Sequence, residues 1–187
     1  MDRDRGWGIR QGIVWVVLIA VAGCSDGVES PRASSPGSLP GAEAFIDAFY
    51  SWDPRALEQT VQAPDDIERV LYYQAWAQAA HYRIQTRRPC ALTDTDQVTC
   101  RVTVTDDFGK VLGYIATDMF TLGFRDGVIV AVDFEGDDPP IFDELFAWIA
   151  SNQPHVMRGP CLDLFSGGKT PAECAAAVAA AAREFVR

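Results

Sequence analysis

The spacing of apolar residues changes once along this chain, near Tyr82, and this change limits the folds that the chain can adopt. Before Tyr82 apolar residues recur every three or four positions, as on one face of a helix. They predict one helix over residues 42–52, a short one that begins at Asp53-Pro54, and a third from about Asp65 to His81. After Tyr82 apolar and polar residues alternate, which is typical of half-buried strands. The predicted class is α+β, with N-terminal helices packed in a strongly curved antiparallel sheet.

Alternation is clearest over residues 98–104, where three valines and Cys100 fall on one side of the predicted strand. The segment from Tyr82 to Leu92 is predicted to pair with it as a hairpin, with the turn at residues 93–97. Two further inward rows follow along the chain: Leu112, Tyr114, Phe120, Leu122 and Phe124, and then Val128, Val130, Val132 and Phe134.

The connection between these two rows contains Asp126-Gly127. A two-residue turn at this dipeptide would expose the row of valines. A three-residue loop, with Gly127 in the left-handed conformation, instead aligns Phe124 with Val128 and buries the valines. The longer loop is therefore predicted.

The chain has five cysteines, of which Cys24 lies in a separate N-terminal context. The other four predict two disulfides, with the local pairing favoured because each pair brackets a turn-like segment: Cys90 with Cys100 and Cys161 with Cys174. Zinc is the alternative reading of four cysteines. It is disfavoured because there is no Cys-x-x-Cys spacing and because His81 and His155 lie in unrelated contexts. No metal or cofactor is predicted.

A helical extension is predicted after the sheet. A helix over residues 141–149 is followed by residues 154–187, in which Thr170, Pro171 and Glu173 have the pattern of a capping box with proline at the first helical position. The alanine-rich helix that follows carries an apolar stripe. We expect the Cys161–Cys174 disulfide to pin this extension to the domain.

The N-terminus has the layout of an export signal. Three arginines precede an apolar run over residues 13–23, which is too short for the ~20 residues of a membrane-spanning helix. The run ends in Val21-Ala22-Gly23-Cys24, which resembles the bacterial lipobox. This implies a signal peptide at 1–23 and lipid, including palmitate, on Cys24. An ordinary signal peptide with a chance cysteine is the alternative.

Residues 24–41 are rich in Ser, Pro and Gly and are predicted to be a flexible tether. The protein is thus expected to be exported into the cell envelope and anchored to the bacterial membrane through lipid, facing outside the cytoplasm. The net charge of −10 makes nucleic acid an unfavourable partner, because phosphate binding needs a basic face.

The order of three helices and an antiparallel sheet, with the segment Phe-Arg-Asp-Gly-Val-Ile-Val-Ala-Val-Asp-Phe-Glu at 124–135, resembles the nuclear transport factor 2-like superfamily, and within it the SnoaL-like proteins. The likeness covers roughly residues 42–137 of a domain placed at 42–153. It implies a cone-like α+β barrel whose mouth often holds a small apolar ligand. Members include isomerases, cyclases, hydrolases and non-catalytic binding modules.

The resemblance does not carry the catalytic residues of the ketosteroid isomerase-like members. The positions that best match their oxyanion-hole tyrosine and aspartate are Phe45 and Phe120, and the segment between Val61 and Asp65 is too short for their general base. The predicted pocket instead has one acidic residue among apolar ones: Phe45, Phe49, Tyr73, Trp76, Tyr114, Asp118, Phe120, Val132 and Phe134.

Asp118 is the one weak catalytic candidate, because it shares the inward parity of its strand. A carboxyl group in a dry pocket has a raised pKa and can act as a general acid or base. The favoured interpretation is a rim position, or pairing with Arg88 or Arg101, which predicts a near-normal or lowered pKa.

The leading functional hypothesis is a non-catalytic module that binds a small apolar ligand or an envelope protein. The alternative is an isomerase, cyclase or hydrolase acting on a small apolar substrate, with Asp118 as acid or base. A homodimer is left open.

Overall fold

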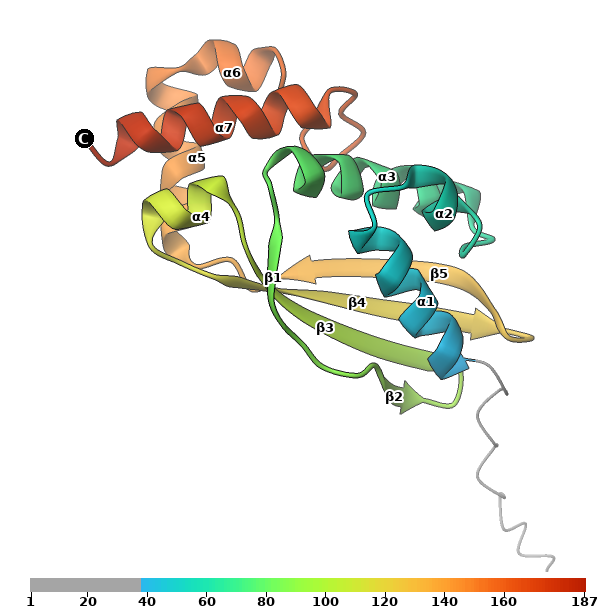
Figure 1. Cartoon of the computed structure of the whole chain (residues 1–187). Coiled ribbons are helices and arrows are strands. Elements are labelled where there is room, and N and C mark those ends of the chain that lie inside the picture. The colour runs from blue at the N-terminus through green and yellow to red at the C-terminus, as the bar shows by residue number, and fades with distance from the viewer. Residues whose placement is uncertain (1–37) are drawn as a thin grey trace, which may run out of the picture. The chain divides into compact units, whose positions relative to one another are not determined.

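The computed structural model describes residues 38–187. The predicted signal peptide at 1–23, the lipid site at Cys24 and most of the tether lie outside the described residues. The described chain has the α+β class expected from its sequence (Figure 1). Its elements, in order, are α1 (Ser38–Tyr50), α2 (Pro54–Glu58), α3 (Pro64–Ala79), β1 (Arg83–Arg87), β2 (Ala91–Asp94), β3 (Gln97–Thr105), α4 (Asp107–Leu112), β4 (Ala116–Arg125), β5 (Val128–Gly136), α5 (Pro140–Asn152), α6 (Pro154–Arg158) and α7 (Pro171–Phe185).

The five strands form one antiparallel sheet in the order β1-β3-β4-β5, with β2 also paired to β3. The sheet is not closed into a barrel, so the predicted barrel closure is wrong for the described residues. α1 and α3 lie over one face of the sheet, and α7 runs beside α3 (Figure 1). α4 to α7 gather at the end of the sheet where β4 begins and β5 ends, with α7 in contact with α3, α4 and α5 (Figure 1).

Buried apolar residues form two clusters. The sheet core joins α1, α2 and α3 to the inner face of the strands: Ala42, Phe45, Ile46, Ala48, Phe49, Leu57, Val61, Val70, Ala77, Cys90, Val98, Cys100, Val102, Val104, Phe120, Leu122, Phe124, Ile129 and Val132. The helical core joins α3 to α4–α7: Trp76, Ala80, Phe108, Leu145, Ile149, Val156, Cys161, Cys174, Ala175, Val178, Ala179, Ala181 and Ala182. Tyr82 packs against both clusters.

Alternation predicted the inner face of β3 and β4 correctly. The three valines and Cys100 of β3 are buried, as are Asp118, Phe120, Leu122 and Phe124 of β4. α1 covers this face with Phe45, Ile46 and Phe49. Its C-terminal carbonyls accept hydrogen bonds from the buried amide of Gln74, which fixes α1 against α3.

The β4–β5 hairpin corrects the predicted loop. Asp126 and Gly127 both have positive φ, 53° and 80°, and form a two-residue turn between Arg125 and Val128. A bulge between Gly123 and Phe124 then restores the burial that this turn would otherwise lose. Because a bulge adds one residue to one strand, it switches which side chains of β5 face inward.

The bulge changes which residues of β5 are buried. Ile129 and Val132 are buried, whereas Val128 and Val130 are only partly so, which corrects the predicted row of valines. Phe120 lies opposite Phe134 in the final register. The tight turn and the bulge together therefore bury Ile129 and Val132.

The segment before β4 was predicted as strand and is helical instead. Asp106 caps α4 by accepting a hydrogen bond from the backbone N–H of Gly109, and Gly113 ends the helix in the left-handed conformation, with φ 80°. Leu112 and Tyr114 therefore do not belong to the inward row of β4. A strong cap and a C-terminal glycine outweigh two apolar residues with the parity of a strand.

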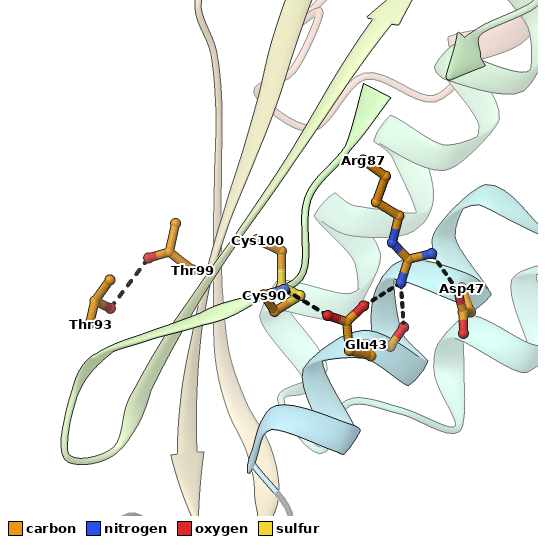
Figure 2. Close-up of a disulfide and its surroundings, with 7 residues drawn as sticks. All are labelled: Glu43, Asp47, Arg87, Cys90, Thr93, Thr99 and Cys100. Carbon is orange, nitrogen blue, oxygen red and sulfur yellow. Dashed lines mark hydrogen bonds and ion pairs between the residues drawn. A yellow bond between two sulfur atoms is a disulfide. The ribbon is translucent and has the colours of Figure 1, made fainter. Parts of the chain in front are cut away.

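The Cys90–Cys100 disulfide is present, as predicted, between the segment before β2 and the inner face of β3. Figure 2 shows how this segment is tied to α1: Glu43 accepts from the Cys90 N–H at 2.6 Å and from Arg87, which also pairs with Asp47. However, residues 82–92 do not form one inward-facing strand. β1 and β2 are separate, and Ile84 and Leu92 are 45% and 40% exposed.

The C-terminal extension docks on the domain through α7. Cys174 and Val178 of its apolar stripe are fully buried, and Cys161 bridges to Cys174 as predicted. The capping box is absent: the side chain of Thr170 makes no capping hydrogen bond, and its hydroxyl donates to the carbonyl of Pro160 at 2.8 Å. At the other end, α1 begins at Ser38, so residues 38–41 are helical and not part of the predicted tether.

The outer edge of β5 is covered by the chain between α2 and α3. Val61 forms a parallel bridge with Ile129, and the N–H of Gln62 donates to the Ile129 carbonyl at 2.9 Å. Asp66 accepts from the N–H of Val132 at 3.0 Å. Arg69 donates to the carbonyl of the same residue, so backbone groups that point away from β4 find partners here.

Candidate functional site

A cavity of about 130 Å³ lies among residues of the sheet core and of the helical core. Its walls come from α1, α3, the start of β4, the end of β5, α5 and the loop between α6 and α7. Most of its lining is aromatic: Phe49, Tyr73, Trp76, Ala77, Tyr82, Asp118, Phe134, Gly136, Asp138, Phe142 and Phe165.

Part of the predicted pocket lines this cavity. Five of the predicted residues do so: Phe49, Tyr73, Trp76, Asp118 and Phe134. Four do not, for two reasons. Phe45, Phe120 and Val132 are packed inside the sheet core, at 0–2% exposure, and leave no space beside them. Tyr114 follows α4, away from the predicted strand position, and its buried hydroxyl makes no hydrogen bond within the described residues.

Asp118 is the polar centre of the cavity. Alternation along β4 turns its side chain inward, and the residue is 3% exposed. The hydroxyl of Tyr50, at the end of α1, donates to its Oδ2 at 2.6 Å. The expected rim position is therefore wrong, and so is the expected arginine partner, because the hydrogen bond of this carboxyl comes from a neutral tyrosine.

The pKa of Asp118 is raised to about 7. Burial is the largest cause, the hydrogen bond from Tyr50 opposes it, and the carboxylates of Asp138, Asp106 and Asp137 add to it. The near-normal or lowered pKa expected from the sequence is contradicted. A buried carboxyl group that titrates near neutrality and lines a cavity has the properties expected of a proton donor or acceptor.

A second buried carboxyl group, that of Asp106, acts electrostatically on Asp118. Asp106 caps α4, and its pKa is raised to about 7. Burial is the largest cause, the hydrogen bond from the Gly109 N–H opposes it, and Asp138 and Asp107 add to it. Burial also raises the pKa of Tyr82, and Asp118, Asp106 and Asp138 add to the effect. The potential at this end of the cavity is therefore negative.

Phe165 closes the cavity on the side of the helical extension. Its ring lies 4.9 Å from that of Tyr73 and 5.2 Å from that of Trp76. Its backbone has a φ of 58°, an unusual value for phenylalanine, in the loop that the Cys161–Cys174 disulfide closes. Phe165 also lines a wider outer pocket with Tyr72 and residues 166–169.

Six lining residues were not in the predicted pocket: Ala77, Tyr82, Gly136, Asp138, Phe142 and Phe165. Asp138 and Phe142 flank the two prolines at the start of α5, where the acidic, proline-bearing segment was visible in the sequence without any indication of what it faced. Nothing in the sequence pointed to Phe165, because its position depends on how the C-terminal extension docks.

Residues 38–187 contain neither a metal-binding cluster nor a membrane-spanning helix. In that part of the chain no group of three or more His, Cys, Asp or Glu residues is arranged to hold a metal ion. Over the same residues no helix has both the length and the apolar character needed to cross a membrane. His81, which follows α3, pairs with Asp107 at 2.6 Å.

Comparison with known proteins gives no match: no family model, no curated protein and no solved structure is significantly similar to the chain.

Proposed function

We propose that this protein is a SnoaL-like binding module whose cavity takes a small, largely apolar organic molecule. The order of helices and strands and the position of α1 and α3 over one face of the sheet support the resemblance. The observation that carries the function is the cavity itself: aromatic rings form most of its wall, and the buried Asp118 faces into it. Ligand sites in proteins combine such apolar walls with a few convergent polar groups.

Binding without catalysis is favoured because the positions that best match the catalytic residues of the ketosteroid isomerase-like members do not face the cavity. Phe45 and Phe120, at the positions best matching the oxyanion pair, are fully buried, with ring centroids 5.6 Å apart. The segment that joins α2 to α3 occupies the edge of β5 and supplies no group to the cavity lining. These residues stabilise the sheet core and are not available to a substrate.

The experiment is a search for retained small molecules in the full chain carrying Cys24→Ser, so that attached lipid does not contribute. Native mass spectrometry, followed by extraction, should find a small molecule bound to this protein. Ala77→Leu should displace it by filling the cavity, whereas Ala150→Leu, on an exposed part of α5, should not. A ligand retained equally by both variants would place binding elsewhere and contradict the proposal.

An acid–base enzyme is the second candidate, and the pKa of Asp118 near 7 specifically favours it. Asp118 would hold or release a proton at Oδ1, and Asp138, in the same lining, would supply a second carboxyl group. Once a ligand is known, its conversion by the protein can be followed. Turnover that is lost in Asp118→Asn, with binding retained, would make the enzyme the better description.

We also infer that the protein is exported and held at the membrane through lipid on Cys24. Both disulfides support an oxidising compartment. Cys24→Ser should release the protein from the membrane fraction and remove the mass of the lipid. Unchanged fractionation and mass would contradict the anchor without affecting the cavity.

A further inference from the structure

The walls of the cavity indicate which chemical class of ligand it takes, an inference that rests on the proposed binding function. Seven of its lining residues carry aromatic rings: Phe49, Tyr73, Trp76, Tyr82, Phe134, Phe142 and Phe165. The rings are close together: Tyr73 lies 4.4 Å from Phe134 and 4.9 Å from Phe165. The faces of aromatic rings carry partial negative charge and attract cations.

The charged groups of the lining have one sign. Asp118 and Asp138 both line the cavity, and its lining among the described residues includes no lysine or arginine. Asp106 and Asp137 add negative potential from just outside the lining, as the raised pKa of Asp118 records. Such an arrangement repels an anion, and it attracts a cation.

The carboxyl group of Asp118 is a hydrogen-bond acceptor that the cavity offers. The hydroxyl of Tyr50 donates to its Oδ2 at 2.6 Å, and the side chain lines the cavity. Ligand sites combine apolar walls with a few such convergent polar groups, and a carboxylate selects a ligand that donates hydrogen bonds.

We propose that the ligand is a small organic ammonium ion, held between the aromatic rings and the carboxylate of Asp118. Its charged nitrogen donates to Oδ1 of Asp118, and its apolar substituents contact the rings of Tyr73, Phe134 and Phe165. The cavity of about 130 Å³ sets the size, since an apolar cavity of roughly this volume takes a molecule as large as benzene.

The pH dependence of binding follows from this arrangement. The groups that face Asp118 are Tyr50 from α1, Tyr82 before β1, Asp106 before α4, and Asp137 and Asp138 after β5. Below its pKa of about 7 Asp118 is mostly neutral, so the cation loses its counter-charge. Binding should weaken by about tenfold for each pH unit below 7 and level off above it, as long as the amine, with a pKa near 10, remains charged.

The experiment compares two probes of one shape, tert-butylammonium and tert-butanol, on the full chain carrying Cys24→Ser. Nuclear magnetic resonance titrations that follow the aromatic side chains give both dissociation constants. At pH 8 we expect tert-butylammonium to bind about tenfold more tightly than tert-butanol, from its charge and its contacts with the rings. Asp118→Asn should remove this preference. Asp126→Asn, which deletes one charge in the exposed β4–β5 turn, should leave it unchanged.

Each outcome separates the inference from the proposed function. If tert-butanol binds as tightly as tert-butylammonium, the cavity is a ligand site but not a cation site. If neither probe binds, the proposed function fails as well. Binding of tert-butylammonium that is indifferent to Asp118→Asn overturns the inference, because the cation then lies elsewhere. Should Asp118→Asn not fold, the pH series on the unsubstituted Asp118 decides: affinity that does not fall between pH 7 and pH 5 overturns it.

Discussion

The sheet core and the helical core differ in the size of the side chains that they bury. The sheet core packs large side chains such as Phe45, Phe49 and Phe120 against strands that also share hydrogen bonds. The helical core contains five alanines, four of them from α7, around a few large residues such as Trp76 and Phe108. Burial stabilises in proportion to apolar area, so a phenylalanine contributes more than an alanine, at ~1.5–3 kcal/mol against about 0.8 for one methyl group.

This difference explains what each disulfide does. Cys90–Cys100 joins segments that β-sheet hydrogen bonds and the Glu43 network already hold (Figure 2). Cys161–Cys174 closes the loop that carries Phe165, and this loop between α6 and α7 contains no helix or strand that would hold it. The first bond therefore reinforces existing structure, and the second supplies much of the order of one cavity wall.

The largest expected effect tests the sheet core. Phe120→Ala should lower the free energy of unfolding by about 3–5 kcal/mol, because its ring contacts those of Phe45, Phe49 and Phe134 and a cavity would remain. Urea denaturation measures this change. A loss below about 1 kcal/mol would mean that the sheet core repacks freely and is not the rigid half of the molecule.

The next effect lies where the two cores meet, at Asp118. Its folded pKa of about 7 exceeds the ordinary ~3.9, so the folded state holds a proton that the unfolded state releases. This contribution to stability is complete below pH 4 and is lost as pH rises through 7, by up to about 4 kcal/mol.

Asp118→Asn should remove this pH dependence, because asparagine does not titrate. The stability of the variant relative to the unsubstituted protein should rise between pH 4 and pH 8, as measured by urea denaturation at several pH values. The Asp126→Asn control, at an exposed turn, should follow the unsubstituted protein. Parallel curves for Asp118→Asn would show that its carboxyl group titrates normally.

Removal of each disulfide sharpens the comparison directly. Closing loops with sequence separations of 10 and 13 residues stabilises by a similar amount, about 3 kcal/mol in the loop-entropy model. The double variant Cys161→Ser/Cys174→Ser should in addition increase amide hydrogen exchange around Phe165. Cys90→Ser/Cys100→Ser should leave exchange in β3 nearly unchanged. Equal local effects would remove the distinction between the two regions.

The smallest effect concerns a local cap on the sheet side. The side chain of Asp53 accepts from the N–H of Arg55 at 2.9 Å at the start of α2. Asp53→Ala should lower the free energy of unfolding by ~1 kcal/mol. Thermal denaturation measures it, and ligand affinity should stay the same because α2 does not line the cavity.

The predictions that the structure confirms are those that depend on residues close together in the sequence. The Asp53-Pro54 helix start, the alternation of β3 and β4 and both cysteine pairings follow from neighbouring residues, and the structure has all of them. Predictions failed where two local signals competed. The tight turn at Asp126-Gly127 and the row of valines were compatible only through a bulge, which alternation alone does not reveal.

The candidate site was only partly predictable, because its walls come from distant segments. Asp118 was identified by its parity, but its environment was not, since Tyr50 is 68 residues away in sequence. Tyr73 was predicted to line the pocket and Tyr72 was not, and the cavity lining contains Tyr73 without Tyr72. The position of Phe165 in the lining depends on the docking of α7 on α3. This contact joins distant parts of the chain, and the spacing of apolar residues within one segment does not predict it.

The chain that covers β5 also limits how this protein can associate with itself. An unpaired strand edge is a template on which a second molecule can add a strand. Here residues 61–66 already bind the first half of β5, at Ile129 and Val132, and the opposite edge is divided between β1 and β2, each with a break in register. Neither edge presents a long regular ladder, so a homodimer formed by extending the sheet is disfavoured, and contact through helices or through the open face of the sheet is the simpler geometry.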